Sequence, residues 1–355
     1  MDTIHTSKPQ AMINKIFSSD NTAGAAPEVL QAIMDAGMGI QQPYGNDDYS
    51  QQVKKTLEAI FECPLNVFLV ATGTAANALA LSVLTPPWGA VLCHPESHIN
   101  NDECGAPEFF TNGAKLVFVD GDHSKLCPQK LAAKAAPNTA DVHSVQASVV
   151  SVSQTTETGS VYSLEELSTI GHICKKNGLK FHMDGARFTN ALVALDCSPA
   201  AMTWQAGVDV LSFGASKNGT LAVEAIILFD QTLAQEMSFR RKRSGHLMSK
   251  LSLMSTQLCA YLKQDLWLNN ARHANAMALK LDQGLRSIKG VEIQGNTVSN
   301  MFFCKMPRPI IDGLLDQGFY FYSDRWDENV VRLVTSFATK EVDVDHFISA
   351  ARELE

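Results

Sequence analysis

The chain has 355 residues, of which 45% are hydrophobic and 19% are charged, and its formal net charge is −8. This composition is typical of a folded globular protein and excludes a largely disordered chain. The acidic balance argues against a nucleic-acid-binding surface, which needs a broad basic face. A run of four basic residues, 240–243, is interpreted as a solvated helix face or, alternatively, as an anion site.

Residues 1–12 lack the apolar run of a signal peptide, and no segment approaches the roughly 18 apolar residues of a membrane span. The eight cysteines form no C-x-x-C pair and no spacing suited to zinc, so we expect reduced thiols and no metal site. We therefore predict a cytoplasmic protein without a membrane or nucleic-acid partner.

Short apolar runs alternate with longer segments of helical periodicity, which predicts an α/β fold with a mainly parallel sheet. The predicted strands are 67–71, 90–93, 116–119, 148–153, 180–183, 208–213 and 225–229. The predicted helices of this part are 27–36, 50–61, 74–84, 163–177 and 186–195. Two long helices, 233–263 and 266–289, and two short strands, 300–305 and 330–336, follow. We predict a large domain over 1–240 and a smaller C-terminal α+β domain over 241–355.

Gly73 and Thr74 lie where the first predicted strand ends and a helix begins. A helix N-terminus offers unpaired N–H groups and a positive dipole to a phosphate, and glycine permits close approach. The same turn is also compatible with plain strand-to-helix geometry, and it matches neither a Walker loop nor a G-x-G-x-x-G motif.

Asp184 and Lys217 each follow their own apolar strand. At the carboxyl ends of α/β strands, a carboxylate could hold a protonated pyridine nitrogen, although Asp184 could instead cap the next helix. A lysine between small residues could form a Schiff base, or could be a surface side chain. Because a phosphate cradle, an acid and a lysine follow strands in chain order, the sequence predicts a pyridoxal 5'-phosphate (PLP) site.

Several segments resemble the L-threonine aldolase family of fold-type-I PLP-dependent enzymes. They are the Ser-Asp segment (17–33), the Tyr-Gly-x-Asp stretch (43–61), the histidine loop (97–106), HMDGAR (182–187) and Ser-Lys (216–217). The resemblance implies cleavage of L-threonine, L-allo-threonine and related β-hydroxy-α-amino acids to glycine and an aldehyde. A phenylserine aldolase or a β-eliminating lyase on the same scaffold is the alternative. A homodimer or homotetramer is implied as well.

The resemblance also implies cofactor-binding roles. Lys217 would carry the cofactor, Asp184 would pair with its ring nitrogen, and Gly73 and Thr74 would hold its phosphate. His98 would stack on the pyridine ring. Downstream of the lysine, Asn218 and Glu224 depart from the family pattern, which commonly has a glycine and a small residue there.

Substrate roles follow from the same resemblance. Arg187, expected beside the cofactor, would bind the substrate carboxylate together with Ser19 and Arg332, and Tyr44 would reach a neighbouring subunit's site. Candidates for the catalytic base are His98 and His143, because histidine titrates near working pH. Glu157 could bind the hydroxyl or a water, or be only a turn residue. We expect His182 to point away from Asp184.

Overall fold

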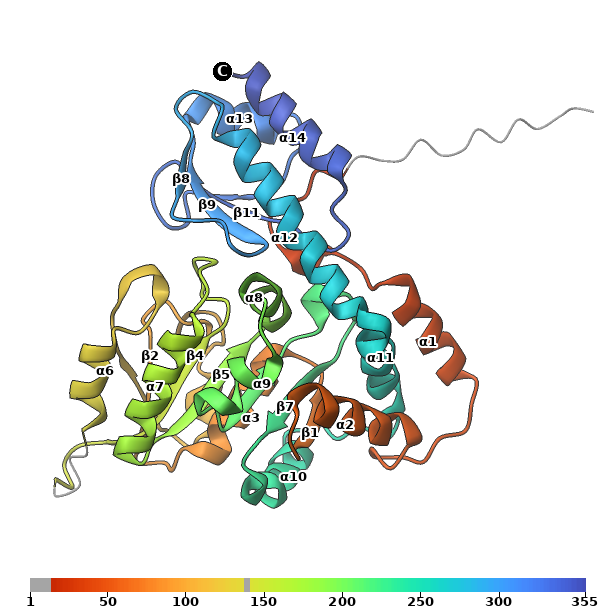
Figure 1. Ribbon diagram of the computed structural model, residues 1–355, viewed down its shortest axis with the longest axis vertical. Coiled ribbons are helices and arrows are strands. Elements are labelled where there is room, and N and C mark those ends of the chain that lie inside the picture. The colour runs from red at the N-terminus through yellow and green to blue at the C-terminus, as the bar shows by residue number, and fades with distance from the viewer. Residues whose placement is uncertain (1–13, 137–140) are drawn as a thin grey trace, which may run out of the picture.

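The computed structural model describes residues 14–136 and 141–355, which form two packed units joined by a long helix (Figure 1). Residues 1–12, in which no signal peptide is expected, lie outside the described residues. The larger unit contains a seven-stranded sheet of order β1-β7-β6-β5-β4-β2-β3, in which β7 runs antiparallel to both neighbours. Its strands are β1 (Asn66–Val70), β2 (Gly89–Cys93), β3 (Lys115–Phe118), β4 (Gln146–Ser153), β5 (Lys180–Gly185), β6 (Val210–Phe213) and β7 (Glu224–Leu228). The predicted α/β fold with a mainly parallel sheet is confirmed.

Helices cover both faces of this sheet. One face carries α3 (Gly73–Leu84), with α4 (His98–Asn101), α5 (Ala106–Phe110) and α10 (Ala234–Arg243) packed around it. The other carries α2 (Asp48–Phe61), α6 (Pro128–Ala135), α7 (Leu164–Asn177), α8 (Phe188–Leu195) and α9 (Pro199–Met202). At the side of the sheet, α1 (Pro27–Gly37) packs against α11 (Ser252–Leu262).

The ends of α7 show how local sequence positions an element that leads into the site. The Ser163 hydroxyl oxygen accepts from the Glu166 backbone N–H at 3.1 Å, and the Glu166 carboxylate accepts from the Ser163 N–H at 2.7 Å. Gly178 ends the helix at φ +68°, a left-handed conformation that glycine adopts without strain. Caps of this kind each contribute about 1 kcal/mol. The chain then enters β5, which carries Asp184.

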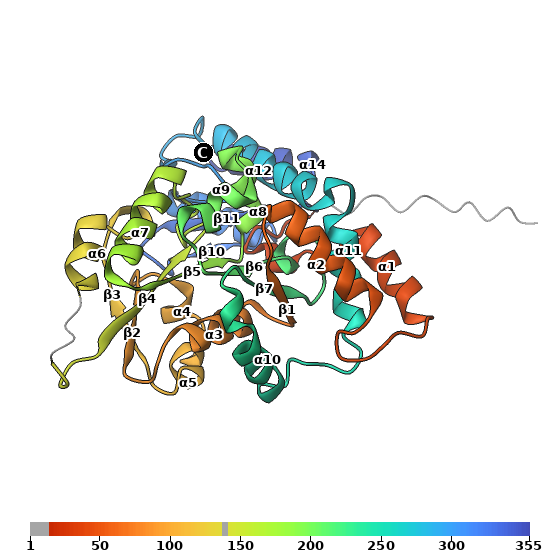
Figure 2. The same cartoon turned by 60° about the horizontal axis from the view of Figure 1, so that its bottom comes forward.

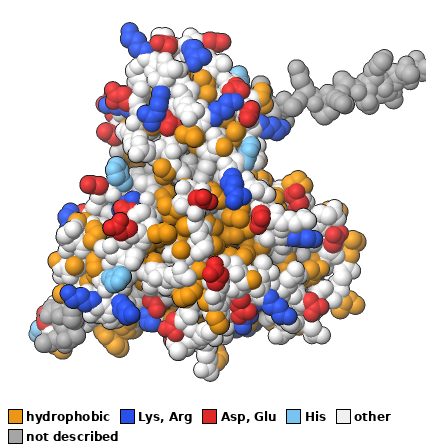
Figure 3. Space-filling view, viewed as in Figure 1, with side chains coloured by type: hydrophobic (Ala, Val, Ile, Leu, Met, Phe, Trp, Pro, Cys, Tyr) orange, Lys and Arg blue, Asp and Glu red, His pale blue; other side chains and the backbone are white. Residues whose placement is uncertain are grey.

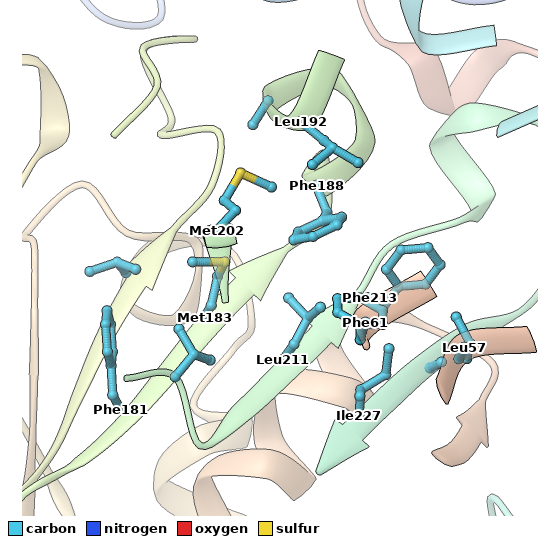
Figure 4. Close-up of a cluster of buried hydrophobic side chains, with 14 of the residues drawn as sticks. Leu57, Phe61, Phe181, Met183, Phe188, Leu192, Met202, Leu211, Phe213 and Ile227 are labelled. Carbon is cyan, nitrogen blue, oxygen red and sulfur yellow. The ribbon is translucent and has the colours of Figure 1, made fainter. Parts of the chain in front are cut away.

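The side chains of β5 alternate between the two faces of the sheet. Phe181 and Met183 enter the large hydrophobic core, to which Phe61, Phe188 and Phe213 also belong (Figure 4). Full burial of one such side chain contributes about 1.5–3 kcal/mol. His182 and Asp184 share the opposite face because side chains two positions apart in a strand point the same way. The expectation that His182 points away from Asp184 is therefore wrong.

The smaller unit contains an antiparallel sheet of order β10-β11-β9-β8. Its elements are β8 (Glu292–Gln294), β9 (Met301–Lys305), β10 (Tyr322–Ser323), β11 (Val330–Val334), α13 (Arg308–Asp316) and α14 (Glu341–Glu353). α12 (Leu266–Leu285) packs against α8 of the larger unit and α14 of the smaller one (Figures 1 and 2). Phe17, near the amino terminus, is also part of the smaller unit's core.

The predicted single helix over 233–263 is wrong, because the chain forms α10 and α11 with a turn between them. Gly245 has φ +84° in this turn, which interrupts the helical path. α11 packs on α1, and its Met254 and Leu258 belong to the larger core. The predicted domain boundary at 240 assigns Met254 and Leu258 to the smaller domain, whereas their side chains pack in the core of the larger unit. Among the described residues, no helix is long and apolar enough to cross a bilayer.

Candidate active site

A cavity of about 420 Å³ lies at the carboxyl ends of β1, β4, β5 and β6. Parallel strands present their following loops at one edge of the sheet, which is the usual ligand crevice of α/β folds. The cavity brings together predicted residues from separate segments of the chain. These are Gly73, Thr74, His98, Asp184, Arg187 and Lys217.

The first turn of α3 forms one end of the cavity. Thr72 caps the helix, and its hydroxyl oxygen accepts from the Ala75 N–H at 3.1 Å, which leaves other first-turn N–H groups without helical partners. A Cβ atom added at Gly73 would meet no atom within 4 Å, so the space beside this residue is open. Backbone donors, a helix dipole and open space together fit a phosphate group.

Asp184 is buried at the floor of the cavity and accepts two hydrogen bonds. Its Oδ1 accepts from the Ala186 N–H at 3.0 Å, and its Oδ2 accepts from the Asn77 side-chain amide at 3.0 Å. Neighbouring His182 lies between the hydroxyl groups of Ser151 and Ser212, at 2.9 and 3.0 Å. Burial lowers the pKa of His182 to about 4, so this histidine is neutral at physiological pH. His182 therefore supplies no positive charge to Asp184.

Lys217 lies in a 3-10 turn, Ser216–Asn218, that is fixed on both sides. The Asn218 amide donates to the Tyr261 hydroxyl at 2.7 Å and to the Trp267 carbonyl at 2.8 Å. The Glu224 carboxylate accepts from the Ala215 N–H at 2.7 Å, and burial raises the pKa of Glu224. The two residues that depart from the family pattern therefore anchor the turn that carries the lysine.

Gly214 explains how close that turn comes to β5. A Cβ atom there would lie 2.4 Å from the Ala186 carbonyl oxygen, well inside van der Waals contact. Only glycine lets the end of β6 approach the Asp184 turn this closely, which brings Lys217 and Asp184 to one cavity.

His98 begins α4 and is held by a buried acid. Its Nδ1 lies 2.8 Å from Oε1 of Glu103, whose side chain is fully buried. The hydrogen bond to Glu103 raises the pKa of His98, against the opposing effect of burial. The Asn77 amide nitrogen donates to Glu103 at 2.8 Å as well as to Asp184, so one amide links the two acids.

Arg187 forms a buried ion pair with Asp20. Its Nε and one terminal nitrogen donate to the two carboxylate oxygens of Asp20 at 2.7 and 2.8 Å. Burial disfavours the charged carboxylate, but Arg187 lowers the pKa of Asp20 below its ordinary value. The Asn300 amide donates to the same carboxylate at 2.9 Å, which connects the pair to the smaller unit.

Arg332, on β11, has guanidinium N–H groups that are not used by the described residues. One terminal nitrogen donates to the Ser18 carbonyl at 3.0 Å, and the guanidinium lies 5.0 and 5.1 Å from the ring centres of Tyr322 and Trp326. Its Nε is buried and has no hydrogen-bond partner among the described residues. Such a donor is costly unless a ligand satisfies it.

Four predicted residues do not line the cavity: Arg332, described above, and Ser19, Tyr44 and His143. Ser19 is adjacent in sequence to the Asp20 pair, and its hydroxyl oxygen accepts from the Asn21 N–H at 3.2 Å. Tyr44 is half exposed, with its ring 5.0 Å from the Lys242 amine. His143 is exposed on the loop before β4, at the opposite edge of the sheet from the cavity.

Three buried polar residues that hold the site were not predicted. Asn77 lies one helical turn after Gly73, Glu103 lies five residues after His98, and Asp20 adjoins Ser19. A polar side chain within an otherwise apolar α3 was the available signal for Asn77. Asp20 and Glu103 lie in the two segments, 17–33 and 97–106, that carry the family resemblance, but their individual roles are recognisable only from their contacts.

A lysine, a buried acid and a phosphate cradle at one edge of a mainly parallel sheet define a fold-type-I PLP-dependent enzyme. The chain belongs to the β-eliminating lyase family, whose model matches residues 17–307, and within it to the L-threonine aldolases. It is 40% identical to a low specificity L-threonine aldolase of a Pseudomonas species, over 86% of this chain and 88% of that protein. A threonine aldolase structure from Leishmania major superposes with a TM-score of 0.89 at 28% identity, covering 96% of this chain and 99% of that one. A putative L-allo-threonine aldolase structure from Listeria monocytogenes has the same fold, with a TM-score of 0.73 at 17% identity and 97% coverage of both chains.

Proposed function

We propose that this enzyme cleaves L-threonine, L-allo-threonine and related β-hydroxy-α-amino acids to glycine and an aldehyde, which is acetaldehyde for threonine. The observation that carries the proposal is the convergence of Lys217, Asp184 and the first turn of α3 on one cavity, in a chain 40% identical to a named threonine aldolase. When bound, PLP supplies an electron sink for the pair left on Cα when a bond to it breaks.

Each residue of the cavity would have a distinct task toward the cofactor. Lys217 would hold it covalently through its amine, and Asp184 would hold a protonated ring nitrogen. Gly73 and Thr74 would bind the phosphate at the open first turn of α3. His98 would pack against the ring, in an orientation set by Glu103.

Arg332 is the stronger candidate for binding the substrate carboxylate. Arg187 already shares two hydrogen bonds with Asp20, whereas Arg332 has a buried Nε without a partner among the described residues. A carboxylate would satisfy that donor and could accept a second bond from the same guanidinium. We assign Arg187 a supporting role, in which it orients Asp20 and the Ser19 segment beside the substrate.

A product assay tests the proposal. Purified enzyme incubated with L-threonine, L-allo-threonine and phenylserine should release glycine together with the matching aldehyde. Cleavage of phenylserine alone would favour the phenylserine aldolase alternative. Ammonia and a keto acid would indicate β-elimination and would contradict the proposal.

We also propose a homodimer or homotetramer in the cytoplasm. Support for assembly comes from exposed apolar side chains on α1, the loop after it and α11, where Met38 and Ile40 are 82% and 101% exposed. Hydrophobic side chains also gather in the middle of the face drawn in Figure 3. Tyr44 and His143 would then act toward a neighbouring subunit. For the domain division, the packing of α11 favours a boundary within α12 over one at residue 240.

A further inference from the structure

Glu157 lies in a turn whose backbone is held by several hydrogen bonds. The hydroxyl groups of Thr156, Thr158 and Ser160 all donate to the His123 carbonyl oxygen, at 3.1, 2.9 and 2.8 Å. Within the turn, the Thr156 N–H donates to the Ser160 carbonyl at 2.9 Å. These bonds restrict the backbone on both sides of Glu157.

The smaller unit holds the same turn from the other side. The Ser299 hydroxyl donates to the Gly159 carbonyl at 2.9 Å. Gly159 has φ +80°, and a Cβ atom there would lie 2.3 Å from the Met301 carbonyl oxygen. The turn is therefore a rigid element packed between the two units, and its conformation and packing space both require glycine.

The side chain of Glu157 has no such anchor. It lines the cavity, and no described residue forms a hydrogen bond or an ion pair with its carboxylate. A hydrogen-bonded turn that holds a carboxylate at the cavity wall, where none of the described residues bonds it, is typical of a group that a ligand engages. Charged and titratable groups face it from the neighbouring elements. His98, Asp184, Arg187 and Lys217 line the same cavity, Arg332 interacts with it electrostatically from β11, and His94 and Tyr162 line the small space behind it.

His98 is a poor alternative base because of its partner. Glu103 and Asp184 share the Asn77 amide, so the Glu103 oxygen accepts from Asn77 and also from His98 Nδ1. The hydrogen bond to Glu103 raises the pKa of His98, which opposes loss of a proton from the ring. A protonated imidazole can donate to a hydroxyl oxygen but cannot accept its proton.

We propose that Glu157, rather than His98 or His143, is the catalytic base that removes the β-hydroxyl proton of the substrate. In this step the O–H bond breaks and its proton moves to the Glu157 carboxylate. The oxygen forms a double bond to Cβ, the Cα–Cβ bond breaks, and its electron pair stays on Cα in the sink described above. A proton from solvent then adds to Cα to complete glycine, and Glu157 returns the hydroxyl proton to solvent, so the protons balance. The inference deepens the proposed function and rests on it.

The pH dependence follows from the surroundings of Glu157. Burial raises the pKa of Glu157, which brings it closer to working pH, as a general base requires. The base is active when deprotonated, so the cleavage rate should fall as pH drops through a value above the ordinary glutamate range. Glu157→Gln should remove this acid limb of the profile.

The test compares Glu157→Gln with Glu165→Gln, an exposed acid at the start of α7. A general base contributes about 10²–10⁴-fold, so Glu157→Gln should lower kcat for threonine by at least about 100-fold while Glu165→Gln leaves it unchanged. Glycine has no β-hydroxyl, so its dissociation constant, measured by calorimetry on the holoenzymes, should be the same for both variants and the wild type. Glu157→Asp, which keeps a carboxylate, should recover part of the rate.

Two results would overturn the assignment: a Glu157→Gln rate within about threefold of the wild type, or a loss of glycine binding in parallel with the rate, since the latter makes Glu157 a binding residue. Glu103→Gln separates the two candidate bases. It should leave the acid limb in place if Glu157 is the base, and an acid limb displaced to lower pH would assign the role to His98. Failure of the proposed function differs from failure of the Glu157 assignment. If the proposed function is wrong, the wild-type enzyme itself releases no aldehyde.

Discussion

The buried pair of Asp20 and Arg187 makes a sharp prediction about stability. The two side chains are 1% and 10% exposed and share two short hydrogen bonds. Asp20→Asn keeps the shape of the side chain but leaves the Arg187 guanidinium buried without its counterion. Removing one partner of a buried ion pair typically costs about 3–5 kcal/mol.

The assay is urea unfolding of Asp20→Asn beside a chemically matched control, Asp312→Asn. Asp312 pairs with Arg308 on the exposed side of α13, with both side chains about half exposed, so its loss should leave the unfolding midpoint unchanged. Comparable effects of the two substitutions would refute the reasoning, because burial would then not determine the strength of the Asp20 pair.

The difference in unfolding free energy between the wild type and Asp20→Asn should depend on pH in one direction only. The pKa of Asp20 is lowered in the folded protein, so its pairing contributes stability above the unfolded value of 3.8 and loses it as pH falls through the folded value. The difference between wild type and Asp20→Asn should be constant near neutrality and shrink in acid. A difference that grows in acid would contradict the assignment.

Three further substitutions test the site. Asp184→Asn should keep the fold and lower the cleavage rate by at least about 100-fold, because a neutral amide supplies no negative charge to keep the ring nitrogen protonated. A normal rate would remove Asp184 from the mechanism. Arg332→Lys should raise KM for threonine about tenfold or more through loss of the planar fork, and an unchanged KM would assign the substrate carboxylate elsewhere. Gly214→Ala should disrupt the Lys217 turn and reduce PLP content, measured by absorbance, because its Cβ would collide with Ala186, whereas Gly24→Ala, with open space around it, should be tolerated.

Much of the fold was predictable because its signals are local. Apolar runs of strand length and the capping pattern of α7 depend on neighbouring residues alone, and so do Asp184 and Lys217 at the ends of strands. The expected orientation of His182 was wrong because side chains two positions apart in a strand share a face, which places His182 on the same face as Asp184. The single helix predicted over 233–263 failed because Gly245 adopts a left-handed conformation within a stretch of helical composition.

The polar residues that hold the site were not predictable in the same way. Asp20 meets Arg187 across 167 residues of sequence, and Asn77 meets Asp184 across 107. Nothing near Asp20 or Asn77 in the sequence indicates these partners. Such contacts follow from the packing of whole elements, so they become visible only once α3, β5 and the amino-terminal segment are placed together.

The most direct test of the account is the location of the covalent link to PLP. Holoenzyme treated with borohydride and digested with trypsin should carry the reduced cofactor on the peptide that contains Lys217, as identified by mass spectrometry, and Lys217→Ala should carry none. Label on a different lysine, or retained label in Lys217→Ala, would contradict the central claim.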